Sequence, residues 1–295
     1  MKIALGLAIV AALIYVAGAG EIFSSLAEFD AVLLVPVFLL FVAALALGAL
    51  NVKILLDAKL KAGFREFFPG YCLSWAAGSL LPGKIGDFSL GYIMRGKIGI
   101  GEMTAIVLLD KIITLFLLSV LASVGVFLFA GEEIAGFVSA GLVLAWLGLA
   151  AFFIFFGGAK ILEKLAPKKY AGGIRDFFAT LKYFIAKERK RVALNSAVTV
   201  LKLVVQSAAF TLIFWGMGVY PNPVDIMLIT SAATIISFVP LTASGLGIKE
   251  GAFAYLALQI GIPLSKSVAN AAVSTALNYA LVALALLAFL KKRPE

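Results

Sequence analysis

Hydrophobic residues lie in long uninterrupted blocks along this chain and do not alternate with polar ones. A helix needs about 20 apolar residues to cross a hydrocarbon core of about 30 Å. Six blocks approach or exceed that length, and they cover residues 3–19, 31–50 (or on to 56), 103–130, 137–156, 192–217 and 266–290. The pattern therefore predicts an all-α integral membrane protein with six transmembrane helices.

Two further apolar stretches are interrupted near their middles. Residues 67–100 contain the break SLLPGKIGD, and residues 224–262 contain the break SFVPLTASGLGIKE. Proline and clustered glycine end helices, so we expect each stretch to form two half-helices joined by a turn. Such a pair is a re-entrant hairpin; the alternative is an ordinary loop in an eight-helix protein.

The positions of Lys and Arg favour re-entrant hairpins over crossing helices. Cations gather on the cytoplasmic side of membrane proteins. With the N-terminus inside, the ten cations of residues 160–191 and the three at 291–293 also fall inside, provided that neither hairpin crosses alone. Lys266 is then the one cation in an outside loop. We expect a multi-pass protein of the cell membrane, with cytoplasmic N- and C-termini and a first helix that is retained and not cleaved as a signal peptide.

The same assignment exposes an internal repeat within a single membrane domain that covers residues 1–295. Helix, helix, hairpin, helix occurs over 1–130 and again, in the opposite orientation, over 137–290. Inverted repeats with discontinuous helices are typical of secondary transporters.

The segment 160–191 between the halves predicts a basic amphipathic helix on the cytoplasmic leaflet. Its apolar positions recur at helical spacing, at Ile174, Phe177, Phe178, Leu181 and Ile185. Such a helix lies in the membrane interface with its cations toward anionic lipids. We expect an orientation anchor without specific lipid recognition.

Composition narrows the chemistry. The chain is 63% hydrophobic and 14% charged, with a net charge of +9, no histidine and one cysteine, Cys72. These values exclude a soluble globular class, a histidine-based catalytic triad and an intramolecular disulfide. We expect no enzyme activity, no cofactor and no metal, because the residues of the usual catalytic and metal sites are missing. We expect no nucleic-acid partner, because the placement of the cations is explained by membrane topology.

The hairpin turns hold the first candidate site residues, a basic and an acidic residue in each. Lys84 and Asp87 lie in the first turn, and Lys249 and Glu250 lie in the second. We expect the second half-helices to begin near Gly86 and Gly247, where free amides and the helix dipole favour a phosphate or carboxylate. The alternative is that the four charges pair with one another across the repeat interface.

Polar stripes on three helices supply the remaining candidates. They predict a hydrated pathway, although each stripe alone is also typical of interhelical hydrogen bonding worth about 0.6 kcal/mol per contact. The stripes are Asn195, Thr199, Lys202 and Gln206; Asn270, Ser274 and Asn278; and Asp110 and Thr114 with Lys111 beside them.

These motifs resemble the two characteristic regions of the lysylphosphatidylglycerol synthase transmembrane family, the flippase-like domain of multiple peptide resistance factors. The similar runs begin at LPGKIGDFSLGYIMRGKIGIGEMTA and at FVPLTASGLGIKEGAFAYLALQIGIP. Leu90 and Thr275 stand where the family has arginines, and Asp110 with Lys111 replaces its Glu-Arg conservatively. The positions that match are Pro82, Lys84, Gly86, Asp87, Pro240, Gly245, Gly247, Lys249 and Glu250.

The resemblance implies translocation of a lipid between leaflets. The expected substrate is an anionic or aminoacylated phospholipid, or a polyprenyl phosphate, with its headgroup between the two hairpins. The chain ends at Glu295, so we expect no synthase domain. Two alternatives stay open: a secondary transporter of a small anion, and a non-transporting subunit that anchors a glycosyltransferase or lipid-modifying enzyme. Expected partners are membrane lipids, with such an enzyme or a second copy of the chain as further candidates.

Overall fold

The computed structural model of the protein describes residues 2–155, 168–238, 242 and 245–290, and most of these residues are in helices. No strand occurs among them. The predicted all-α class is therefore confirmed.

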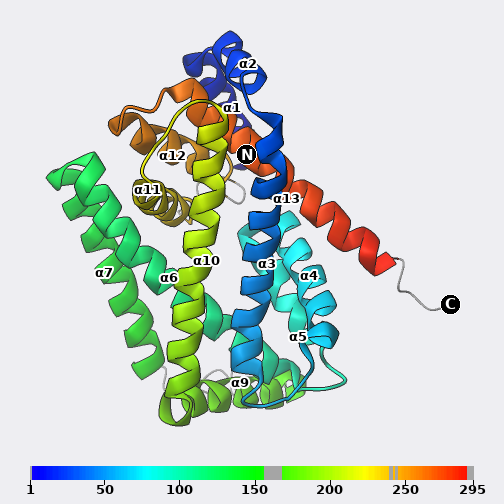
Figure 1. Cartoon of the computed structure of the whole chain (residues 1–295). Coiled ribbons are helices and arrows are strands. Elements are labelled where there is room, and N and C mark those ends of the chain that lie inside the picture. Colours follow the sequence, from blue (N-terminus) through cyan, green and yellow to red (C-terminus); the bar gives the residue numbers. More distant parts are fainter. Residues whose placement is uncertain (1, 156–167, 239–241, 243–244, 291–295) are drawn as a thin grey trace. The chain divides into compact units, whose positions relative to one another are not determined.

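Five described helices are long and apolar enough to cross a membrane (Figure 1). They confirm five of the six predicted blocks, and four of them begin a few residues earlier than predicted. Acidic residues occupy the first turns of two of them, Glu102 and Glu132, where the helix dipole favours negative charge. The five are α3 (Leu34–Leu56), α6 (Ile100–Ala130), α7 (Glu132–Phe155), α10 (Arg189–Gly216) and α13 (Leu264–Leu290).

The first predicted block does not continue as one straight helix. Helix α1 (Lys2–Ala17) ends before Gly18, whose φ of 77° lies in the left-handed region, and α2 (Ala19–Ala27) follows at a bend of 78°. Glycine adopts this backbone conformation readily, whereas other residues are strained by it. The bent pair is a sixth candidate span if both helices together cross the membrane.

Two compact units divide the chain. The first comprises Met1–Leu45, Leu115–Val138 and Val200–Leu287, and the second comprises Ala46–Thr114, Ser139–Thr199 and Ala288–Glu295. The boundaries fall within the long helices, so each unit draws on both predicted halves of the sequence.

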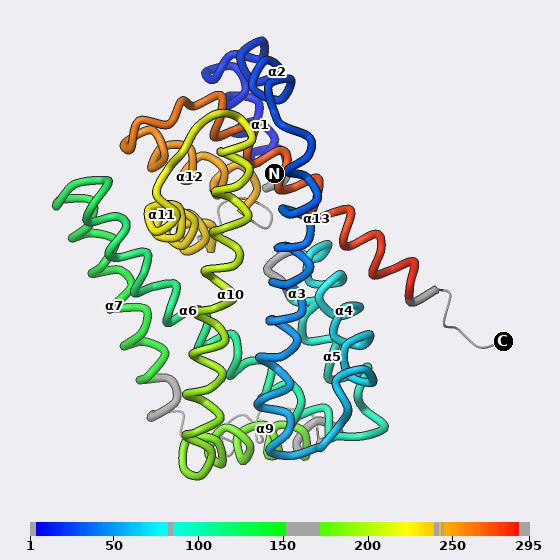
Figure 2. Tube along the Cα trace, viewed as in Figure 1, coloured from blue at the N-terminus to red at the C-terminus, as the bar shows by residue number. Residues whose placement is uncertain are grey.

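In the first unit, α11 (Pro223–Ile236) packs against α12 (Ile248–Gln259), as the predicted second hairpin requires (Figure 2). Asn222 caps the start of α11 by accepting a hydrogen bond from the Val224 N–H at 2.9 Å. Phe253 of α12 stacks on Phe214 of α10, with ring centroids 6.0 Å apart. These contacts fix the hairpin in an apolar core.

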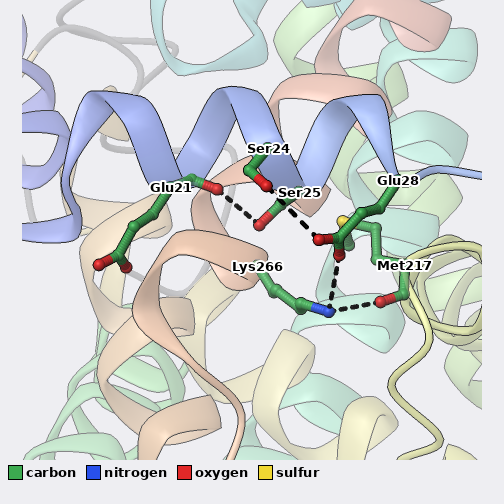
Figure 3. A network of polar contacts seen from close by, with 6 residues as sticks. All are labelled: Glu21, Ser24, Ser25, Glu28, Met217 and Lys266. Atoms are coloured by element: carbon green, nitrogen blue, oxygen red, sulfur yellow. Dashed lines mark hydrogen bonds and ion pairs between the residues drawn. The ribbon is translucent and has the colours of Figure 1, made fainter.

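Lys266, the one cation predicted to lie in an outside loop, has two polar partners in the first unit. The Lys266 ammonium donates a hydrogen bond to the Met217 carbonyl at 2.6 Å and lies 3.4 Å from the Glu28 carboxylate (Figure 3). The Ser24 hydroxyl donates to the other oxygen of Glu28. Lys266 therefore joins α2, the end of α10 and α13, which gives this cation a structural role whichever side of the membrane it occupies.

In the second unit, α4 (Phe64–Leu80) packs against the 3₁₀ helix η2 (Pro82–Phe88) and the short helix α5 (Ser89–Ile93). A side chain at Gly86 would overlap the Ala77 carbonyl of α4. The two backbones therefore touch directly. The predicted start of the second half-helix near Gly86 is wrong, because 82–88 forms a 3₁₀ turn and α5 begins at Ser89.

Helix α9 (Lys168–Lys187) confirms a helix within the basic segment, but its apolar face differs from the prediction. Phe178, Leu181 and Phe184 are buried by the protein itself, whereas Ile185 is 68% exposed. Phe184 therefore replaces Ile185 on the packed face. The cations at 160 and 164 and those at 291–293 lie outside the described residues, and the helix's position at the membrane surface stays a prediction.

Candidate functional site

A small pocket in the second unit contains two of the predicted site residues, Asp87 and Lys111. It lies between the α4 hairpin and the helices α3 and α6, and it has room for about one water molecule. Its lining is Val52, Tyr71, Ser74, Trp75, Asp87, Leu90, Val107 and Lys111.

An ion pair is the main polar feature of this pocket. The Lys111 ammonium lies 2.6 Å from the Asp87 carboxylate, and the two side chains are 35% and 10% exposed. At this distance the pair is a charge-assisted hydrogen bond, which is stronger than a neutral one. The pairing joins the break in the first hairpin to a candidate membrane span, α6.

The α4 helix positions Asp87 through two residues one turn apart. The Ser74 hydroxyl donates to the Asp87 carbonyl at 2.7 Å and approaches the Gly86 carbonyl at 3.3 Å. A side chain at Gly78 would occupy the space of the Asp87 carboxylate. A hydroxyl that fixes the turn and a glycine that makes room thus place the acid beside α4.

A buried hydrogen-bond network surrounds the neighbouring acid, Asp110. The Asn195 amide donates to the Asp110 carboxylate at 3.0 Å and to the Asn51 carbonyl at 2.9 Å. The Asn51 amide donates in turn to the Thr199 hydroxyl at 2.9 Å. Each of these four residues is at most 4% exposed. The network therefore ties α3, α6 and α10 together through polar groups.

Sequence reasoning missed part of this site. Asn51, Tyr71, Ser74 and Trp75 were not among its predicted residues, although Asn195 and Thr199 were on a predicted stripe. Asn51 carried a signal, because it is the first polar side chain in the apolar run that begins at Ala31. Residues 71, 74 and 75 share one face of α4, but nothing in the sequence distinguishes that face from an ordinary packing surface.

In the second hairpin, a carboxylate of the protein itself already engages one backbone amide of the predicted anion site. Helix α12 begins after Gly247 as expected, but the Glu250 carboxylate accepts the hydrogen bond of the Gly247 N–H at 2.8 Å. A carboxylate at this position satisfies the free amide and opposes a second anion there. Lys249 is half-buried in the first turn of α12.

The glycines of that turn serve packing. Gly245 and Gly247 have φ values of 74° and 80°. A side chain at Gly247 would come within 2.8 Å of the Gly6 carbonyl of α1, and one at Gly245 within 2.7 Å of Ser237. The close approach predicted for a ligand is thus made by the protein's own backbone.

The remaining predicted residues do not gather into one site. Lys202 is half-buried, Gln206 is exposed, and Asn278 is half-buried. Asn270 is fully buried and its amide donates to the Phe210 carbonyl at 2.8 Å, which is an interhelical bond between α13 and α10. Because Gln206 is exposed, it is not part of the buried network around Asp110, and its place on a hydrated pathway stays a prediction. The Lys84 side chain and Pro240 lie outside the described residues.

Comparison with known proteins identifies one family. The model described as lysylphosphatidylglycerol synthase TM region matches residues 3–285. No curated protein and no solved structure matches the chain.

Proposed function

Because the chain belongs to the lysylphosphatidylglycerol synthase TM region family, a family of membrane domains associated with lipid flipping, we propose that it translocates a lipid between membrane leaflets. Its apolar helices and its family make it a multi-pass membrane protein. The proposed substrate is an anionic or aminoacylated phospholipid or a polyprenyl phosphate.

The Asp87–Lys111 pair is the observation that carries this proposal. Ionisable groups within membrane segments are expensive to bury and mark substrate or ion pathways. The pair lies at the break of the first hairpin and lines the pocket. Lys111 would bind the phosphate of a headgroup, and Asp87 would bind its amine where one is present.

The pocket is too small for a lipid headgroup as it stands, so binding requires a rearrangement of its side chains. With room for about one water, the pocket must widen to admit a headgroup, and we propose that it does so by separation of the Asp87 and Lys111 side chains. A headgroup with both charges replaces each lost partner, so neither side chain is left as an unpaired buried charge. The acyl or prenyl tails would stay in the bilayer.

We further propose that both hairpins are re-entrant within an inverted repeat of residues 1–130 and 137–290. At 1.5 Å per residue, the 14 residues of α11 reach about 21 Å, short of a core of about 30 Å. The 12 residues of α12 reach about 18 Å. Neither helix is long enough to cross alone, and the packing of α11 against α12 supports a return to the same side over one broken span.

Reconstitution tests the proposal. The full chain in liposomes is assayed for flipping of fluorescent phosphatidylglycerol, its aminoacylated form and a polyprenyl phosphate. We expect Lys111→Met and Asp87→Asn to lower the rate for the substrate at least about tenfold, the effect of about 1.4 kcal/mol. Lys97→Met is the matched control, because Lys97 pairs with Glu66 at the surface and both side chains are largely exposed.

Three results would count against the proposal. Equal rates for wild type and Lys111→Met would exclude the assigned pair, and a loss in Lys97→Met of the same size would show a non-specific effect. Failure of the wild type to move any of the three lipids would argue against translocation.

A further inference from the structure

Three buried side-chain oxygens without hydrogen-bond partners among the described residues belong to residues in or next to the Asp110 network of the second unit. The side-chain oxygens of Asn51 and Asn195 have no partner within the part of the chain that the structure describes, and both residues are fully buried. The Thr114 hydroxyl, one turn along α6 from Asp110, also lacks a partner there. Buried polar atoms are nearly always satisfied, so three such oxygens in one region indicate a missing ligand.

The amide orientations define what that ligand must be. The nitrogens of both asparagines are already engaged, that of Asn195 with the Asp110 carboxylate and that of Asn51 with the Thr199 hydroxyl. The free atom of Asn195 is therefore an acceptor, since its nitrogen donates to a carboxylate and a carbonyl, and in this orientation Asn51 offers a second one; acceptors bind a proton donor or a cation.

Charge favours a cation over a neutral donor. The pocket and the network together contain two carboxylates, Asp87 and Asp110, and one ammonium, Lys111. Lys111 contacts Asp87 directly, so the one ammonium cannot neutralise both carboxylates. A water molecule would satisfy acceptors but would leave the remaining buried charge uncompensated.

We propose that Asp110, Asn51 and Asn195, with Thr114 at the edge, form a binding site for one alkali-metal cation such as Na⁺. Carboxylate, amide and hydroxyl oxygens are ligands for hard cations. A single positive charge neutralises the site, whereas a divalent ion would leave an excess charge buried. No group of three or more acidic or thiol side chains, as a divalent site commonly uses, occurs in the described residues.

A role for this cation in lipid movement rests on the proposed function, but its binding does not. An ion bound between α3, α6 and α10 would stabilise the arrangement of these helices beside the Asp87–Lys111 pair. Occupancy of the site would thereby favour one conformation of the substrate pocket, which is the basis of ion coupling.

Binding of ²²Na⁺ to the purified full chain tests the site without any lipid transport. We expect saturable binding of one ion per chain, displaced by unlabelled Na⁺. Asp110→Asn removes the charge and should weaken binding at least about tenfold, and Asn51→Ala removes one ligand and should weaken it several-fold. Asp176→Asn is the matched control, because Asp176 is exposed on α9 in the same unit.

The outcomes separate this proposal from its rivals. Absence of saturable Na⁺ binding by the wild type overturns it, whether or not the variants fold. Undiminished binding in both folded variants overturns the assignment to these residues. Thermal stability of the wild type that does not change when choline is replaced with Na⁺ or K⁺ also overturns it. Na⁺ binding without lipid flipping supports the site while contradicting the proposed function.

Discussion

At the scale of single residues, the first hairpin depends on positions where a side chain has no room. Gly86 lies directly against the Ala77 and Gly78 backbones, and Gly78 lies against the Asp87 carboxylate. Both contacts belong to the second unit and fix the acid of the candidate site. The glycines of the sequence motif are therefore explained by contacts within the protein.

Gly86→Ala tests this contact. The new methyl group meets the Ala77 backbone, which cannot move aside as a flexible side chain would, so we expect a loss of about 3 kcal/mol in stability. Thermal unfolding in detergent measures it. Gly96→Ala is the control, because no atom lies within 4 Å of the added carbon. Equal melting temperatures for the two variants would contradict the packing.

The surface ion pair of Glu66 and Lys97 makes the stability of the protein depend on pH in a predictable direction. Glu66 begins α4, outside the candidate spans, and accepts a hydrogen bond from the Lys97 ammonium. This bond, with the attraction of the Lys97 charge, lowers the pKa of the Glu66 carboxyl from its ordinary value of 4.5. A lowered pKa in the folded state adds stability above the unfolded value, and the contribution disappears as pH falls through the folded value.

We therefore expect Glu66→Gln to destabilise the protein slightly at pH 7 and to have a smaller effect at pH 3. Melting temperatures of wild type and variant at both pH values measure the difference. A larger difference in melting temperature at pH 3 than at pH 7 would contradict a stabilising Glu66–Lys97 pair.

At the scale of the elements, α9 is attached to the second unit by its apolar face and by polar contacts at its end. The Tyr183 hydroxyl donates to Glu188 at 2.8 Å, and the Lys59 ammonium lies 4.5 Å from the Tyr183 ring centroid. Arg191 pairs with Glu188 at 3.1 Å and donates to the Ile54 carbonyl. The basic helix is thus part of a packed unit as well as a cationic surface.

Two neighbouring substitutions distinguish the packed face from the exposed one. Phe184 is fully buried and Ile185 is 68% exposed. We expect Phe184→Ala to cost about 3 kcal/mol and Ile185→Ala less than about 0.5 kcal/mol. Hydrogen exchange of the α9 amides in detergent measures the local opening of the helix. Faster exchange in Ile185→Ala than in Phe184→Ala would reverse the assigned faces.

At the scale of the whole molecule, the orientation in the membrane rests on the distribution of cations and is open to a direct test. Cys72 is the single cysteine, so a Cys72→Ser background accepts one new cysteine at a time. With cytoplasmic termini, a membrane-impermeant thiol reagent should label Glu132→Cys on intact cells. It should label Lys187→Cys only after permeabilisation. Labelling of Lys187→Cys on intact cells would invert the proposed topology.

The sequence by itself determined the helical class, five of the long helices and both hairpin breaks. Long apolar blocks and Pro-Gly breaks are local in the chain, and the cost of burying unsatisfied backbone in lipid leaves helices as the solution for such blocks. The charged turn, the polar stripe and the family motifs likewise predict Asp87, Asp110 and Lys111 as candidate site residues from the sequence alone.

Only the tertiary structure decided which of these residues meet. Periodicity reports that Asn195 and Gln206 share a helix face, but not that one packs against Asp110 while the other is exposed. It also could not show that Glu250 caps its own helix at the expected anion site. Such outcomes depend on neighbours that are distant in the chain, as with Asn51 and Thr199, and a local pattern contains no information about those distances.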